Sequence, residues 1–213
     1  MKKYLKNRTF AIGLTVLIII AGTLFGSHRS LEAEAYPAER YFVDGSDGYS
    51  IQRELDNRTG LASNLLTVGS RYLVSGDQAC AELENAIREM DEAKTVSEKA
   101  KANQKLTAAT EHMDLVLDEE MLSRSDERYR QQIRADLMAA NQNIGRSDYN
   151  ELAYHYNTEV LGKFPANILA KMTGVEELET FQMSVGGQDN SDSDYEHHGQ
   201  GHNGRGYHGG SDH

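Results

Sequence analysis

Two tyrosine–asparagine pairs, seven residues apart, constrain the fold of this chain more than any other feature. Tyr149-Asn150 and Tyr156-Asn157 fall on nearly the same face of an α-helix, because two helical turns cover about seven residues. A tyrosine buries its ring while its hydroxyl needs a partner, and an asparagine inside a helix usually serves a specific hydrogen bond. We therefore expect the pairs either to lock the helix register through an internal polar network or to form a docking site for a partner.

Apolar side chains recur every three or four residues before and between these pairs. This spacing predicts one long helix over residues 126–163. Gly145 lies within it and predicts a local bend or weak point. Pro165 ends the helix, because proline has no N–H for the hydrogen-bond ladder, and residues 167–178 are expected to fold back as a short apolar return.

Three earlier segments have the same helical spacing: residues 49–74, 78–94 and 97–117. Asp77 and Ser97 are expected to cap the second and third of these segments. No run of alternating β-branched residues predicts a sheet. The sequence therefore predicts an all-α fold, in which residues 49–178 form an antiparallel four-helix bundle with long helices.

Residues 10–26 are uncharged and largely apolar, and they follow a short basic N-terminus. As a helix they span about 25 Å, close to the hydrocarbon thickness of a bilayer. Two interpretations remain open: a retained single transmembrane helix, and a signal peptide cleaved after Ala33-Glu34-Ala35. In the first, residues 1–27 form a basic N-terminus and an anchor that contacts the lipid bilayer through residues 10–26. The positive-inside rule then places the N-terminus in the cytoplasm and the bundle outside.

Two segments flank the predicted bundle. Residues 28–48 contain Pro37 and an Asp/Gly cluster, which predict an irregular linker. Residues 179–213 are expected to form a disordered tail, since Gly, Ser, Asp, Asn and His dominate beyond residue 186.

Charge and cysteine content exclude several classes. The net charge is −11, and Lys2, Lys3, Lys6 and Arg8 contribute +4, so the remainder carries −15. Such an acidic body lacks the clustered basic surface that nucleic-acid binding needs. Cys80 is the single cysteine, so the chain forms no internal disulfide.

The candidate metal ligands are five tail histidines: His197, His198, His202, His208 and His213. Neutral imidazoles on a glycine-rich segment bind zinc, nickel or copper weakly, without the fixed spacing of a closed site. We expect no other cofactor. The body histidines form no Glu-x-x-His pair and the chain has no H-E-x-x-H motif, which favours a non-enzymatic protein.

The Tyr-Asn pairs are followed by Phe164-Pro165-Ala166-Asn167, and this combination resembles the last helix of the LemA family of membrane-anchored bacterial helical-bundle proteins. The resemblance continues in the first helical segment, at Arg58, Leu61, Asn64, Leu65 and Tyr72, where Gly60 and Ser63 depart from the family pattern. It implies an N-terminal membrane helix carrying a four-helix bundle, with no catalytic residues. Phe164, Pro165 and Asn167 join the two Tyr-Asn pairs as candidate partner-binding or register residues.

The resemblance favours a scaffold or adaptor for another envelope or membrane protein. The alternative function is an envelope metal-binding protein that acts through its histidine-rich tail.

Overall fold

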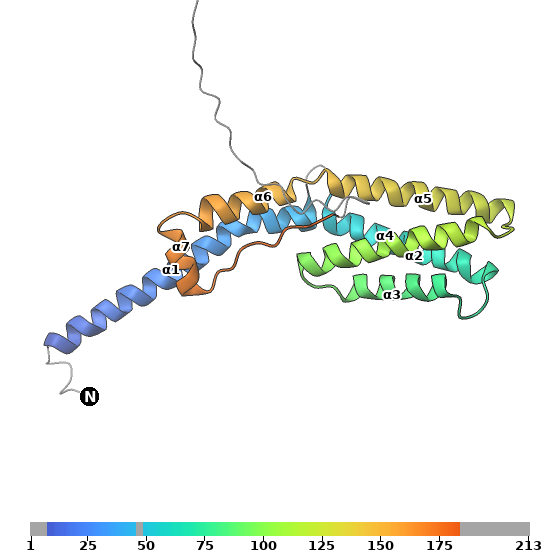
Figure 1. Ribbon diagram of the computed structural model, residues 1–213. Coiled ribbons are helices and arrows are strands. Elements are labelled where there is room, and N and C mark those ends of the chain that lie inside the picture. Colours follow the sequence, from blue (N-terminus) through green and yellow to red (C-terminus); the bar gives the residue numbers. More distant parts are fainter. Residues whose placement is uncertain (1–7, 46–48, 184–213) are drawn as a thin grey trace, which may run out of the picture. The chain divides into compact units, whose positions relative to one another are not determined.

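The computed structural model describes residues 8–45 and 49–183, whose regular elements are all helices, with no β-strand (Figure 1). The helices are α1 (Arg8–Asp44), α2 (Ile51–Tyr72), α3 (Gln78–Glu92), α4 (Val96–Asp118), α5 (Arg124–Gly145), α6 (Tyr149–His155), the π-helix η1 (Tyr156–Leu161) and α7 (Ala166–Thr173). The predicted all-α class is confirmed.

Helix α1 is continuous, so the prediction of an irregular linker is wrong for residues 28–44. Residues 28–44 are helical because the rest of the fold covers one face of α1. The residues along this face form a stripe with alternating spacings of four and three, which places them on one side of a helix. The stripe consists of Leu24, His28, Leu31, Ala35, Ala38 and Phe42, all of which are buried or partly buried. Pro37 has no N–H, so the Ala33 carbonyl four residues earlier lacks its helical hydrogen bond. The helix tolerates this loss because Pro37 and Ala33 both lie on the exposed face of α1.

Helix α2 is central to the core. It packs against α3, α4 and α5, and α3 packs against α4. Leu55, Leu83, Leu106 and Ile133 come one from each of these four helices, and each is at most 1% exposed. Their burial shows that the apolar stripes predicted from the sequence meet in one shared core.

Side-chain caps fix where these helices begin. Asp77 caps α3 by accepting a hydrogen bond from the backbone N–H of Ala79, as predicted. The cap predicted at Ser97 is wrong, because α4 begins two residues earlier. Thr95 and Glu98 form a capping box there, in which each side chain accepts from the other's backbone N–H.

The single helix predicted over residues 126–163 is wrong. Helix α5 ends at Gly145, and α6 and η1 follow as separate elements. The backbone N–H groups of Arg146 and Ser147 turn back onto the last carbonyls of α5, including that of Ile144, which closes the helix. The weak point predicted at Gly145 is confirmed, because the helix breaks there.

Helix α7 forms the start of the predicted apolar return, and the chain leaves it through Gly174, whose φ of 75° is a left-handed conformation that favours glycine. Residues 175–183 then run extended beside α1 (Figure 1). Phe181 is 2% exposed and belongs to the main core, so the tail predicted to begin at residue 179 is wrong for residues 179–183.

Candidate functional site

The two asparagines of the Tyr-Asn pairs hold the extended C-terminal segment. The Asn150 side-chain amide donates to the Phe181 carbonyl (2.8 Å), and its Oδ1 accepts from the Phe181 N–H (2.7 Å). Asn157 repeats this arrangement with the carbonyl and N–H of Leu178, at 2.9 and 2.8 Å. Each side-chain amide therefore pairs with both the backbone N–H and the backbone carbonyl of one residue in the segment, as a neighbouring β-strand would. We name these four residues the asparagine clamp.

The two tyrosines fix the same region through their hydroxyls. Tyr149 is 1% exposed and donates to the Glu179 carbonyl at 2.7 Å, while Tyr156 donates to the Leu31 carbonyl of α1 at 3.1 Å. Burial raises the pKa of Tyr149 to about 12 and also raises the pKa of Tyr156. Both hydroxyls therefore remain protonated donors at neutral pH. All four side chains of the Tyr-Asn pairs make internal contacts, as a polar network that locks the register would require.

Phe164, Pro165 and Asn167 lie apart from the clamp, at the turn into α7. The Phe164 side chain is 79% exposed, and a cis peptide bond joins it to Pro165. Asn167 Oδ1 is buried and has no hydrogen-bond partner within the described part of the chain. The structure therefore divides the predicted site residues into an internal set and a surface turn.

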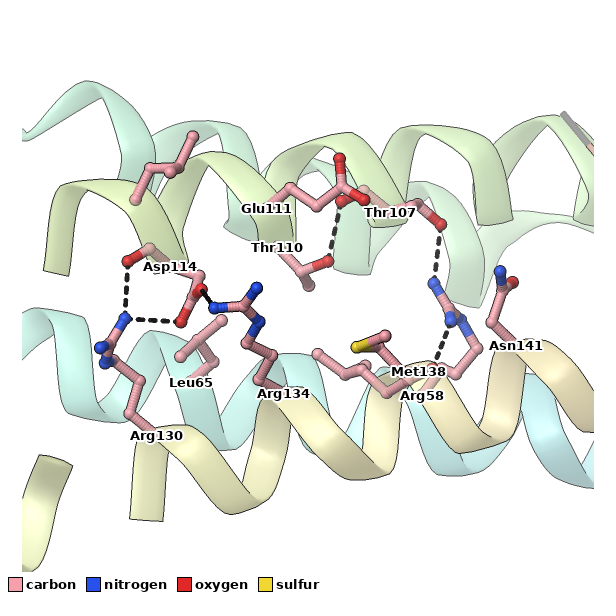
Figure 2. Close-up of a pocket in the computed structure, with 12 residues that line it drawn as sticks. Arg58, Leu65, Thr107, Thr110, Glu111, Asp114, Arg130, Arg134, Met138 and Asn141 are labelled. Carbon is pink, nitrogen blue, oxygen red and sulfur yellow. Dashed lines mark hydrogen bonds and ion pairs between the residues drawn. The ribbon is translucent and has the colours of Figure 1, made fainter. Parts of the chain in front are cut away.

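A second candidate site is the groove between α4 and α5, which α2 closes from below (Figure 2). Both helices pack on α2 much more than on each other, and a cavity of about 420 Å³ opens between them. Leu115 of α4 and Met138 of α5 are 67% and 57% exposed along this cavity. We call this feature the α4–α5 groove.

One end of the α4–α5 groove holds a buried arginine (Figure 2). Arg58 is 2% exposed and donates to the Leu137 carbonyl at 2.9 Å and to Thr107 Oγ1 at 2.7 Å. Its Nε has no hydrogen-bond partner, and no carboxylate lies within ion-pair distance among the described residues. Burial lowers the pKa of Arg58 to about 10, an effect that Glu111 opposes. Arg58 is thus a buried cation at neutral pH without a directly bonded anion.

The other end of the groove holds a compensated arginine. Arg130 is 4% exposed and forms ion pairs with Asp114 (2.8 Å), Asp118 (2.7 Å) and Glu127 (3.0 Å), while Arg134 reaches Asp114 at 3.3 Å. The hydrogen bond with Glu127 is the main cause that raises the pKa of Arg130. Carboxylates therefore neutralise the guanidinium groups at this end of the groove, whereas Arg58 at the other end has no carboxylate partner.

We expect the fold to lose stability in acid because of Asp126, in the first turn of α5 near Arg130. Asp126 accepts hydrogen bonds from Tyr72 and Ser123, and these bonds hold its pKa below the ordinary 3.8. A lowered folded-state pKa stabilises the fold above pH 3.8, and this contribution disappears as the pH falls through the folded-state pKa. We expect Tyr72→Phe to reduce the drop in thermal unfolding midpoint between roughly pH 5 and pH 2.

The matched control for this experiment is Tyr129→Phe, which removes a hydroxyl from a half-exposed ring on α5. It should leave the acid-induced drop unchanged. Equal pH profiles for wild type and Tyr72→Phe would contradict the role assigned to Asp126.

The sequence pattern did not reveal the groove. Arg58 belongs to the motif in the first helical segment, but nothing in the sequence distinguishes Arg130 and Asp114, because charged residues at helical spacing usually form a solvated face. The five tail histidines lie outside the described residues. Among the residues that the structure describes, no cluster of three or more His, Cys, Asp or Glu side chains is placed to hold a metal ion.

Together, the fold and these sites define an all-α protein whose first helix is long and apolar enough to cross a membrane, and whose Tyr-Asn pairs fasten a C-terminal segment to the helices. A family model for the LemA family matches residues 49–192, more than half of the chain. The chain therefore belongs to the LemA family, and the match extends past the predicted boundary at residue 178 to include the clamped segment. No curated protein matches the chain significantly.

Proposed function

We propose that the protein is a non-enzymatic scaffold of the bacterial envelope, anchored by residues 10–26 and presenting α2–α5 as an antiparallel four-helix bundle to another envelope or membrane protein. The N-terminus is cytoplasmic and the bundle lies outside, because basic residues precede the apolar run and the body is acidic. Large apolar side chains such as Leu17 and Ile18 are 64% and 61% exposed on α1, as side chains that face lipid would be.

Retention of the anchor is favoured over cleavage after Ala35. Ala35 is 6% exposed and lies inside a continuous helix, where it packs in one cluster with Leu31, Tyr156 and Leu161. Cleavage at this point would remove Leu31, and with it the carbonyl that accepts from Tyr156. The folded body thus depends on residues that a signal-peptide interpretation would discard.

The α4–α5 groove is the proposed docking surface, and its geometry is the observation that carries the function. A segment of another protein that lies between α4 and α5 would cover the exposed side chains of Leu115 and Met138. An acidic side chain on that segment would supply the anion that Arg58 lacks. The expected partner therefore carries a segment with apolar residues next to an aspartate or glutamate.

Site-directed photo-crosslinking in intact cells tests this proposal, with the crosslinker placed at Leu115. We expect one discrete cross-linked partner, and a loss of at least about tenfold when Met138→Asp puts a charge on the opposite rim. Met121→Asp is the matched control, because Met121 is 96% exposed at the turn between α4 and α5. Cross-linking that persists in Met138→Asp, with the thermal midpoint unchanged, would contradict docking in the groove.

The alternative function, metal binding by the tail, is supported by the composition of residues 197–213. Removing residues 186–213 separates the two proposals. If the protein is a scaffold, the Leu115 cross-link should persist without the tail. If the tail carries the function, the cellular phenotype and metal tolerance should be lost with it.

A further inference from the structure

Helix α7 has a second apolar face that the fold does not use. Its inner face packs against α1, where Ala170 is 5% exposed and forms one cluster with Leu31 and Ala35. On the outside, Ile168 and Met172 are 50% and 61% exposed, and they lie one helical turn apart. Phe164 precedes Ile168 by four residues and is 79% exposed.

This face lies close to the segment proposed to cross the bilayer. Helix α7 contacts α1 at Leu31 and Ala35, and the uncharged run of α1 ends at Gly26. Leu31 follows Gly26 by five positions in the helix, a distance of about 7.5 Å along the axis. In Figure 1, α7 lies beside the middle of α1, where the N-terminal half of α1 leaves its neighbours. An axial distance this short is within the thickness of the headgroup region of a bilayer.

Charges of both signs surround this face. Lys163 pairs with Glu159, and Glu32 and Glu34 of α1 and Glu176 and Glu177 beyond α7 are exposed. Lys163 precedes Phe164, and Lys171 lies between Ile168 and Met172; both lysines are exposed. Arg29 adds a third exposed cation on α1, between Gly26 and the α7 contact. Exposed aromatic and aliphatic side chains next to lysines are typical of segments that lie in the membrane interface.

We propose that α7 and the preceding turn lie in the interface of the membrane that α1 crosses, with Phe164, Ile168 and Met172 inserted at the boundary between headgroups and acyl chains. This inference rests on the membrane anchoring proposed above. A single spanning helix leaves the body free to tilt and rotate, whereas a second contact beside it fixes the orientation of α6 and η1 over the lipid surface. The partner of this face is the lipid itself.

Tryptophan fluorescence tests the inference directly, because the chain contains no tryptophan. Single variants of the full-length protein are reconstituted into vesicles of phosphatidylcholine and phosphatidylglycerol, with and without acyl chains brominated near the headgroup. We expect Phe164→Trp and Ile168→Trp to emit at shorter wavelength than Leu115→Trp on the α4–α5 groove. We also expect brominated lipid to quench the first two several-fold more strongly. Both α7 positions are exposed, and circular dichroism verifies the helical content of each variant.

A fourth variant, Ile18→Trp, separates this inference from the anchor itself. It is measured in lipid brominated near the ends of the acyl chains, because Ile18 is the middle residue of the apolar run 10–26. Quenching of Ile18→Trp together with both α7 variants supports the proposal. Quenching of Ile18→Trp alone overturns the interfacial position of α7 and leaves the anchor standing. Absence of quenching at Ile18 overturns the anchor, and the interfacial position of α7 falls with it.

Discussion

Replacing Phe42 by alanine is expected to lower the free energy of unfolding by about 3–5 kcal/mol, the usual cost of removing a phenylalanine from a packed core. Phe42 is 5% exposed, and its ring meets that of Tyr149 edge to face at 5.1 Å and that of Phe181 at 6.1 Å. Lys99 Nζ lies 5.5 Å from the same ring centre. One side chain therefore joins α1, α4, α6 and the C-terminal segment, and its loss leaves a cavity where all of them meet.

The matched control is Tyr36→Ala on the same helix. Tyr36 is 58% exposed, so its truncation removes an aromatic ring from α1 without opening a cavity, and it should change stability by less than about 1 kcal/mol. Urea unfolding of the detergent-solubilised full chain measures both variants. Similar, small effects of the two substitutions would show that the second half of α1 is not part of the cooperative fold.

Breaking the asparagine clamp is the second large effect that we expect. The double variant Asn150→Leu, Asn157→Leu removes four hydrogen bonds to the backbone of Leu178 and Phe181 and leaves those groups facing aliphatic side chains. We expect the free energy of unfolding to fall by roughly 2–4 kcal/mol. This is the lower part of the range for four hydrogen bonds, because the clamp is only partly buried. Amide hydrogen exchange should show that residues 175–183 lose protection first, since the clamp is what fastens them.

The control for the clamp is Asn57→Leu on the exposed surface of α2. It makes the same chemical change in a helix, including the small gain in helix propensity, without disturbing a described hydrogen bond. Unchanged stability and unchanged exchange in the double variant would contradict the internal role of the Tyr-Asn pairs and favour docking of a partner at this site.

Local sequence chemistry was sufficient where a helix and its boundary depend on neighbouring residues. The apolar spacing predicted α2 and α3 closely, and Asp77 caps α3 because the capping hydrogen bond spans only two residues. The same logic failed at Ser97, because Thr95 with Glu98 offers two reciprocal hydrogen bonds where Ser97 offers one. The long helix over residues 126–163 was predicted because its apolar spacing continues through Gly145, although the backbone does not.

The candidate sites were predictable only in part. The Tyr-Asn pairs stood out because two of them occur one heptad apart, but their sequence does not show which residues they bind. The groove was missed because it depends on how far α4 and α5 separate over α2, which no periodicity records.

The sequence by itself determined the helical class, the apolar N-terminal run and the family, because these follow from composition, from spacing within a few turns, and from short motifs. Only the tertiary structure decided that residues 28–44 are helical and that residues 179–183 are part of the fold. Both depend on contacts between residues far apart in the chain, such as the bond from Tyr156 to the Leu31 carbonyl across 125 positions. The free energy that orders such segments comes from a surface that exists only after the other helices have packed, so it leaves little trace in the local pattern.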